Sequence, residues 1–247
     1  MKNTTLFLAI ALVAAQPILA DSKDDLKSAI QKLSAASSYG WSSKVENAGA
    51  GGGGRGRAGG PSSGKVSKDG YATITRTVGD NTRETVIKDG KSVTKNQDGV
   101  WQTQAEMAAA RGGGGGGGRG GAGGRGGAGG ANALPATQAE QLLAGVRELK
   151  SDDGVYSGAL TKEAVAARLG FGGRRGGAEA PPPPADAKGS AKFWVKEGVL
   201  SKYEFNVQGT MSFNGNDREI NRTTTVEIKD VGVAKVEVPE DAKKKLQ

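Results

Sequence analysis

The amino-acid sequence predicts an α+β domain built on a mainly antiparallel sheet. The order of local patterns is one helix, a run of strands, two helices and a second run of strands, which is typical of this class. Asp-Gly and Glu-Gly dipeptides join neighbouring strands, and glycine adopts the positive φ that tight hairpin turns require. Roughly 170 residues remain outside the leader and the Gly-rich tracts described below, which is enough for one hydrophobic core.

The first predicted element is a helix over residues 23–37. Its apolar residues recur at the i, i+3, i+4, i+7 spacing of one helix face: Leu26, Ala29, Ile30 and Leu33. A strand over residues 39–45 (YGWSSKV) follows this helix.

Residues 65–103 are predicted to form a β-meander. The β-rich segments are YATITRTV, TRETVIK, KSVTKN and VWQT, separated by the turn sequences GDN, DG and QDG. Each Asp-Gly between alternating segments is a strong hairpin signal.

Two helices are expected in the middle of the chain. The first covers residues 137–150, with Thr137 and Glu140 as a capping box at its start. Its apolar face has four residues: Leu142, Leu143, Val146 and Leu149. Tyr156 lies in a short extended segment, and Thr161 caps a second helix carrying Val165 and Leu169.

The C-terminal region is the most strand-like part of the sequence. A two-residue turn at Glu197-Gly198 would make AKFWVK and VLSKYEFNVQGTMSF one long hairpin. One face would then carry Trp194, Lys196, Val199, Ser201, Tyr203, Phe205 and Val207, and the other Phe193, Val195 and Leu200. The next strand places on one side Ile220, Thr224, Val226 and Ile228, and a closing strand (VGVAKVEVPED) carries Val231, Val233, Val236 and Val238.

Three low-complexity tracts interrupt the domain, at residues 48–64, 111–135 and 170–189. Gly-rich chain cannot bury enough apolar surface to offset its ordering entropy, so we expect mobile insertions. The formal charge of the chain is +8, and removal of Lys2 with the leader leaves +7. Seven arginines of the tracts account for this remainder: Arg55, Arg57, Arg111, Arg119, Arg125, Arg174 and Arg175.

The N-terminus is predicted to be a secretory signal peptide, residues 1–20. Lys2 precedes a ten-residue apolar run, residues 6–15, and a small residue, Ala20, ends the segment before polar DSKDD. The alternative is a membrane anchor, but the run is shorter than the roughly 20 residues that span a bilayer. No Cys follows the cleavage site, which excludes a lipoprotein. We therefore expect an exported protein, in the periplasm or cell envelope, comprising residues 21–247.

The absence of Cys and His narrows the possible chemistry. It excludes disulfides, zinc sites of the Cys/His type and nucleophiles paired with His. We expect no catalytic site, no metal and no cofactor. Asp152-Asp153 could face a cation, but calcium loops need several more oxygen ligands, so a solvated turn is favoured.

Three segments combine hairpin turns with Trp residues: the first helix with YGWSSKV, the segment VIKDGKSVTKNQDGVWQT, and AKFWVKEGVLSKYEFNV with TTTVEIKDVGVAKVEVPED. Together they resemble the LolA-like superfamily, which comprises periplasmic lipoprotein carriers and LppX/LprG-type lipid-binding lipoproteins. The matching positions are Trp101, Trp194, Gly198, Gly232 and Pro239. The resemblance implies a curved antiparallel sheet, a half-barrel, with helices covering its concave face and lipid or acyl chains bound between them. The missing lipoprotein Cys and the Gly/Arg/Pro tracts depart from the family pattern.

The main bulky aromatic residues have two interpretations. Trp41, Trp101, Trp194, Tyr203 and Phe205 either pack the core of the sheet or line a ligand cavity. The second interpretation makes these five residues the candidate ligand-binding site.

The tract arginines also have more than one interpretation. They lie on solvated insertions, contact anionic envelope or lipid surfaces, or bind nucleic acid. Nucleic acid is disfavoured because only Phe171 interleaves them and base stacking needs aromatic residues.

Two functional hypotheses follow. The first is a non-enzymatic protein that binds a lipid, an acyl chain or a lipoprotein segment in the cavity of the half-barrel. The alternative is a structural or interaction protein of the cell envelope whose Gly/Arg-rich loops contact anionic surfaces.

Overall fold

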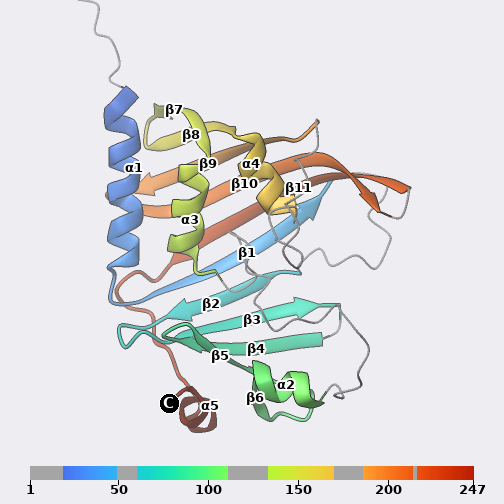
Figure 1. The fold of residues 1–247 in the computed structure, drawn as a ribbon. Coiled ribbons are helices and arrows are strands. Elements are labelled where there is room, and N and C mark those ends of the chain that lie inside the picture. The colour runs from blue at the N-terminus through green and yellow to red at the C-terminus, as the bar shows by residue number, and fades with distance from the viewer. Residues whose placement is uncertain (1–18, 49–59, 80, 111–132, 170–185, 214–215) are drawn as a thin grey trace, which may run out of the picture.

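The computed structural model describes residues 19–48, 60–79, 81–110, 133–169, 186–213 and 216–247. Eleven strands lie in these residues: β1 (Tyr39–Asn47), β2 (Ser62–Val66), β3 (Ala72–Val78), β4 (Asn81–Lys88), β5 (Lys91–Lys95), β6 (Trp101–Thr103), β7 (Val146–Asp152), β8 (Val155–Leu160), β9 (Lys188–Lys196), β10 (Val199–Phe213) and β11 (Asn216–Lys229). They form one curved, unclosed sheet in the order β6-β5-β4-β3-β2-β1-β11-β10-β9-β8-β7 (Figure 1). All neighbours pair antiparallel, so the α+β half-barrel class is confirmed.

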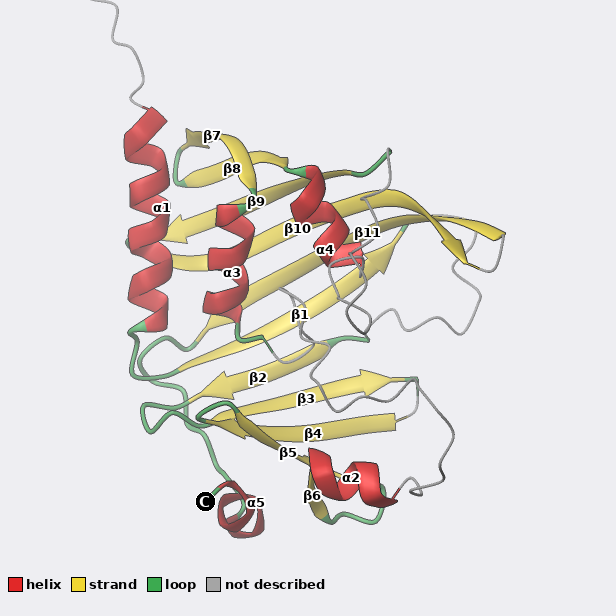
Figure 2. Cartoon of the chain, viewed as in Figure 1, coloured by secondary structure: helices red, strands yellow, loops and turns green. Residues whose placement is uncertain are grey.

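Five helices accompany the described strands: α1 (Leu19–Ser34), α2 (Gln104–Ala110), α3 (Pro135–Ala144), α4 (Lys162–Leu169) and α5 (Glu240–Leu246). Figure 2 shows α1, α3 and α4 on one side of the sheet. We call this side the helix face; its buried strand residues include Trp41, Ile74, Tyr203 and Val226. The opposite side is the outer face.

The main hydrophobic core lies between the helix face and these three helices. The predicted apolar face of α1 is buried, with Leu26, Ile30 and Leu33 fully enclosed. The helix predicted over residues 23–37 is therefore confirmed, although it begins and ends a few residues earlier.

The predicted hairpins are also confirmed. Asp89 and Gly90 join β4 to β5 with φ values of 49° and 76°, the left-handed conformation that a two-residue hairpin turn requires. Glu197 and Gly198 join β9 to β10 in the same way, with φ values of 54° and 74°. These turns fix the strand pairing of both regions.

The helix prediction for residues 137–150 is wrong in its second half. Helix α3 ends at Ala144, and the Gly145 N–H donates to the Leu142 carbonyl oxygen at 3.0 Å. The chain then turns into β7, which pairs with β8 at the edge of the sheet. A Cβ on Gly145 would lie 2.5 Å from the Cβ of Ala164, so the missing side chain lets α4 approach this turn.

Of the two predicted helix caps, the one at Thr161 is confirmed and the one at Thr137 is wrong. Leu134 occupies the N-cap of α3 and no side chain caps the helix, so the Thr137–Glu140 capping box is wrong. Thr161 does cap α4, because its Oγ1 accepts a hydrogen bond from the Ala164 N–H at 3.1 Å.

The closing strand predicted for VGVAKVEVPED is wrong as well. β11 ends at Lys229, a turn follows, and the chain continues without strand pairing to α5. β11 already pairs with β1 and β10, so this segment has no free neighbour beside β11. Val233 is consequently 74% exposed.

A second, smaller core lies on the outer face at the other end of the sheet. Its buried members are Val86, Val93, Trp101, Ala242 and Leu246. Helix α5 thus covers the outer face of β4 to β6, whereas α1, α3 and α4 cover the helix face of β7 to β11.

An ordered element begins inside the C-terminal end of each predicted low-complexity tract. Residues 62–64 lie in β2, Pro135 starts α3, and residues 188–189 begin β9. Residues 49–59, 111–132 and 170–185 of the tracts lie outside the described residues, as does the apolar run of the leader. Helix α1 begins at Leu19, so the predicted cleavage point after Ala20 lies in its first turn.

Candidate functional site

The strand register assigns each side chain to a face of the sheet. Alternate residues of a strand point to opposite faces, and directly paired residues share a face. Trp41 pairs with Ile228, and Tyr203 pairs with Val226, so all four lie on the helix face.

A β-bulge in β10 changes the face predicted for the C-terminal hairpin. The register shifts between Leu200 and Lys202, so that Lys202 pairs with Trp194 and Tyr203 pairs with Phe193. The Ser201 hydroxyl donates to the Trp194 carbonyl oxygen at 3.0 Å. The prediction that Trp194 shares a face with Tyr203 is therefore wrong, because one extra residue moves every later side chain to the other face.

The five candidate aromatic residues are split between the two faces. Trp41, Tyr203 and Phe205 lie together in the main core on the helix face. Trp101 is buried beneath α5 on the outer face. Trp194 is half-buried on the outer face, with the Lys202 ammonium 4.7 Å from its ring centroid. The structure thus brings three of the five together.

The two buried tyrosines of the helix face have polar partners on α3. The Tyr203 hydroxyl lies 2.6 Å from Gln138 Oε1 and donates to it. Burial raises the pKa of Tyr39 to about 12, an effect that a hydrogen bond with the Ala136 backbone partly offsets. Burial likewise raises the pKa of Tyr203 well above its ordinary value. Both phenols remain protonated and attach α3 to the sheet.

Two buried polar atoms of this layer have no hydrogen-bond partner among the residues that the structure describes. They are Nε1 of Trp41 and Oε1 of Gln141. Trp41 lies over Gly64, where a Cβ would approach its indole within 2.8 Å. Gln141 lies three residues after Gln138 on α3, so the two side chains share one side of the helix. An unsatisfied buried donor and acceptor are unusual, because each costs about 1–3 kcal/mol.

The register also separates the charges of the sheet. In β1 to β5 and β8 to β11, the arginines with described side chains occupy helix-face positions: Arg76, Arg83 and Arg222. The carboxylates of the same strands occupy outer-face positions: Glu46, Glu84, Glu204, Asp217, Glu219 and Glu227. The described helix face of these strands therefore carries positive charge only.

Sequence reasoning missed Gln138, Gln141 and the arginines of the helix face. One signal was present: Arg222 alternates with Ile220 and Thr224, which the sequence assigned to an apolar face. A charged residue in such a series marks either the end of the core or a polar site within it.

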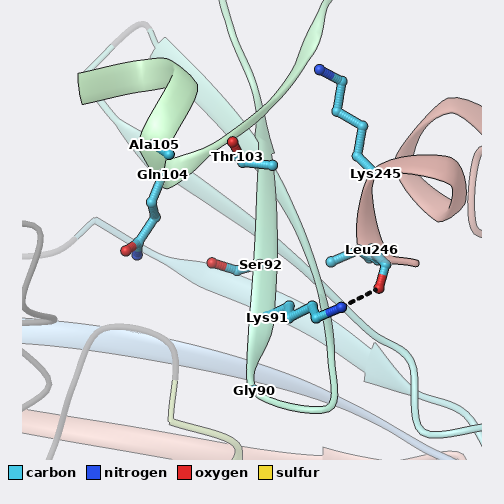
Figure 3. Close-up of a pocket in the computed structure, with 8 residues that line it drawn as sticks. All are labelled: Gly90, Lys91, Ser92, Thr103, Gln104, Ala105, Lys245 and Leu246. Carbon is cyan, nitrogen blue, oxygen red and sulfur yellow. Dashed lines mark hydrogen bonds between the residues drawn. The ribbon is translucent and has the colours of Figure 1, made fainter. Parts of the chain in front are cut away.

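A pocket of about 310 Å³ lies at the β4–β5 hairpin (Figure 3). It is lined by Gly90, Lys91, Ser92, Thr103, Gln104, Ala105, Lys245 and Leu246. The Lys91 ammonium donates to the Gln247 backbone oxygen at 3.0 Å, and Lys245 pairs with Glu106. Both cations of the pocket are thus already engaged, and it lies away from the helix-face layer.

The remaining site predictions concern charged groups. All seven tract arginines lie outside the described residues. Asp152 and Asp153 are exposed at the β7–β8 turn. Within the described ranges, no three Asp or Glu side chains group in a way that could hold a metal ion.

Comparison with known proteins identifies similar folds. No protein-family model matches the sequence, and no curated protein matches it. The Mycobacterium tuberculosis lipoprotein LppX is 11% identical, with a TM-score of 0.46 over 89% of this chain and 99% of LppX. LprF from Mycobacterium bovis is 11% identical, with a TM-score of 0.46 over 90% of this chain and 98% of LprF. A LolA superfamily protein from Nitrosomonas europaea is 10% identical, with a TM-score of 0.31 over 87% of this chain and 94% of its own. A LolA superfamily protein is thus among the solved structures similar to this chain, as the sequence resemblance predicted.

Proposed function

We propose that this protein is an exported, non-enzymatic carrier that binds the acyl chain of a lipid or lipoprotein between the helix face and α1, α3 and α4. The observation that carries the proposal is the presence of two unsatisfied buried atoms, Trp41 Nε1 and Gln141 Oε1, in a mainly apolar layer whose buried Tyr203 hydroxyl does have a partner. The carbonyl oxygen of an ester or amide at the start of an acyl chain could accept a hydrogen bond from Trp41 Nε1. Only an amide also has an N–H that could donate to Gln141 Oε1, so an ester would satisfy Trp41 alone.

Apolar burial would supply most of the binding free energy. The layer contains Phe193, Phe205 and Leu200, all at most 5% exposed, and a bound methylene gains about 0.8 kcal/mol on leaving water. Side chains of α1 and α3 fill this layer in the present structure. Binding therefore requires these helices to move outward from the sheet, which exchanges helix–sheet contacts for ligand–sheet contacts.

The proposed export depends on residues 1–20. No helix in the described parts of the chain has the length and apolar character needed to cross a bilayer. A periplasmic fraction that contains the chain cut after Ala20 would support export, and uncleaved protein in the cytoplasm would contradict it.

Native mass spectrometry of residues 21–247, purified from a bacterial periplasm, tests the binding. We expect extra mass that disappears on denaturation and is recovered as lipid in an organic extract. A clean protein mass that does not change after incubation with a bacterial lipid extract would refute the carrier proposal.

Two matched variants locate the ligand. Trp41→Phe removes the indole N–H from the helix face, and Trp194→Phe makes the same change on the outer face. We expect Trp41→Phe to weaken lipid binding about tenfold, the effect of one lost hydrogen bond of about 1.4 kcal/mol, and Trp194→Phe to leave it unchanged. Equal losses in both variants would place the ligand elsewhere.

A further inference from the structure

Two half-buried arginines meet at one end of the helix-face layer. Arg168 lies near the end of α4, and Arg222 lies on the helix face of β11. Arg222 Nη2 donates to the Arg168 carbonyl oxygen at 2.7 Å. The Arg168 guanidinium carbon lies 5.0 Å from the centroid of the Phe205 ring. The pair therefore lies directly against the apolar layer.

Neither guanidinium has an acidic partner among the described residues. None of the ion pairs between described residues includes Arg168 or Arg222. Burial lowers the pKa of Arg168, the Tyr203 hydroxyl raises it, and the charge of Arg222 lowers it again. Burial alone lowers the pKa of Arg222. Two like charges in a partly desolvated place are unfavourable unless an anion joins them.

Few of the N–H donors of the pair form hydrogen bonds with described residues. A guanidinium has five N–H donors, and its planar fork matches phosphate and carboxylate oxygens. The described contacts are one N–H bond from Arg222 to a carbonyl oxygen and the stacking of Arg168 on Phe205. No carboxylate of the described sheet strands β1 to β5 and β8 to β11 shares this face, so none of them competes with a bound anion for the two guanidinium groups.

We propose that Arg168 and Arg222 bind the anionic head group, a phosphate or a carboxylate, of an amphiphile whose acyl chain lies in the helix-face layer. The inference rests on the function proposed above and specifies its ligand class. A head group held at the pair would place the attached chain over Phe205 and Val207, which are 5% and 0% exposed.

Binding of four probes with the palmitoyl chain, below their micellar concentrations, tests the proposal on residues 21–247. Palmitate and lysophosphatidylglycerol are anionic, lysophosphatidylcholine is zwitterionic, and monopalmitoylglycerol is neutral. Affinities are measured by isothermal titration calorimetry. We expect the anionic probes to bind about tenfold more tightly than monopalmitoylglycerol, because one hydrogen bond between charged groups contributes enough free energy for a tenfold change in affinity.

Matched variants identify the residues responsible. Arg168→Gln and Arg222→Gln should each remove most of the anionic preference without changing the affinity for monopalmitoylglycerol. Arg147→Gln removes the same charge from an exposed position on β7 and should retain the preference. Unchanged affinity for the neutral probe also reports that each variant is folded. Should a Gln variant fail to fold, Arg222→Lys keeps the charge but loses the fork, and we expect a reduced preference.

The outcomes separate this inference from the proposed function. Tight binding of all probes with equal affinity would overturn the head-group site and leave the carrier function standing. Binding of none would overturn the carrier function. Inorganic phosphate alone should not compete with lysophosphatidylglycerol, and competition at equal molar concentration would instead indicate a site for a free anion.

Discussion

The hydrogen bond between Tyr203 and Gln138 offers the sharpest test of how α3 is held on the sheet. The Tyr203 side chain is fully buried, whereas Gln138 is half-buried at the surface of α3. Their oxygen atoms lie 2.6 Å apart. We predict that the two single substitutions have unequal effects on the free energy of unfolding, because the partner left behind differs in its access to water.

The magnitudes follow from that asymmetry. Tyr203→Phe leaves a Gln138 amide that can turn toward water, so we expect a loss of about 1 kcal/mol. Gln138→Leu leaves a phenol hydroxyl with no partner in the core, so we expect about 2–3 kcal/mol. In the double variant both polar groups are gone. Its loss should be smaller than the sum of the single losses by about 1 kcal/mol.

Urea unfolding followed by far-ultraviolet circular dichroism measures these values, with Tyr156→Phe as control. Tyr156 is a half-buried tyrosine of β8, and its substitution should change stability by less than about 0.5 kcal/mol. The slope of free energy against urea should stay constant across the set. Additive losses within about 0.3 kcal/mol would refute the reasoning, because independent sites do not share a hydrogen bond.

Three further predictions concern pH and packing. Burial raises the pKa of Tyr39 to about 12, so the protonated phenol contributes fully to the free energy of unfolding below pH 10, and this contribution is lost as the pH rises from 10 to 12. In Tyr39→Phe, the urea midpoint should therefore fall less steeply over this pH range. The hydrogen bond from Lys245 lowers the pKa of Glu106 from 4.5 to about 2, so the Glu106 carboxylate contributes to the free energy of unfolding above pH 4.5, and this contribution is lost as the pH falls toward 2. The urea midpoint of Glu106→Gln should therefore change less with pH over this interval. Gly64→Ala would place a Cβ 2.8 Å from the Trp41 indole and closer still to a carbonyl oxygen of β3, so we expect a loss of about 1–3 kcal/mol and altered tryptophan fluorescence; wild-type stability would contradict this packing.

Local patterns in the sequence predicted much of the fold correctly. The apolar side of α1 and the hairpins at Asp89-Gly90 and Glu197-Gly198 depend on residues near one another in the chain. Spacing and turn chemistry therefore suffice to identify them. The α+β class follows because these elements alternate in blocks.

Features decided by distant contacts were not predicted. Val146 and Leu149 have helical spacing after Leu142, but pairing with β8 makes their segment a strand. The VGVAKVEVPED segment has strand propensity, but β11 is already paired on both sides. Propensity is a weak prior in both cases, and tertiary pairing overrides it.

The candidate site was predicted in part. Trp41, Tyr203 and Phe205 share the helix face, whereas Trp101 and Trp194 do not. Alternation alone could not separate them, because the bulge in β10 adds one residue that the hairpin sequence does not reveal. Arg168 and Arg222 are 54 residues apart in the chain, and only the folded structure brings them together.

The two hydrophobic cores on opposite faces also bear on how the molecule opens. The core under α5 has five buried residues and depends on a seven-residue helix at one end of the sheet. The main core, by contrast, extends over three helices and most strands. Because the cores share the sheet but no buried side chain, we expect them to unfold as separate cooperative units. Amide hydrogen exchange should be faster in α5, β5 and β6 than in α1 and β10, so this end of the sheet would open while the helix layer stays closed.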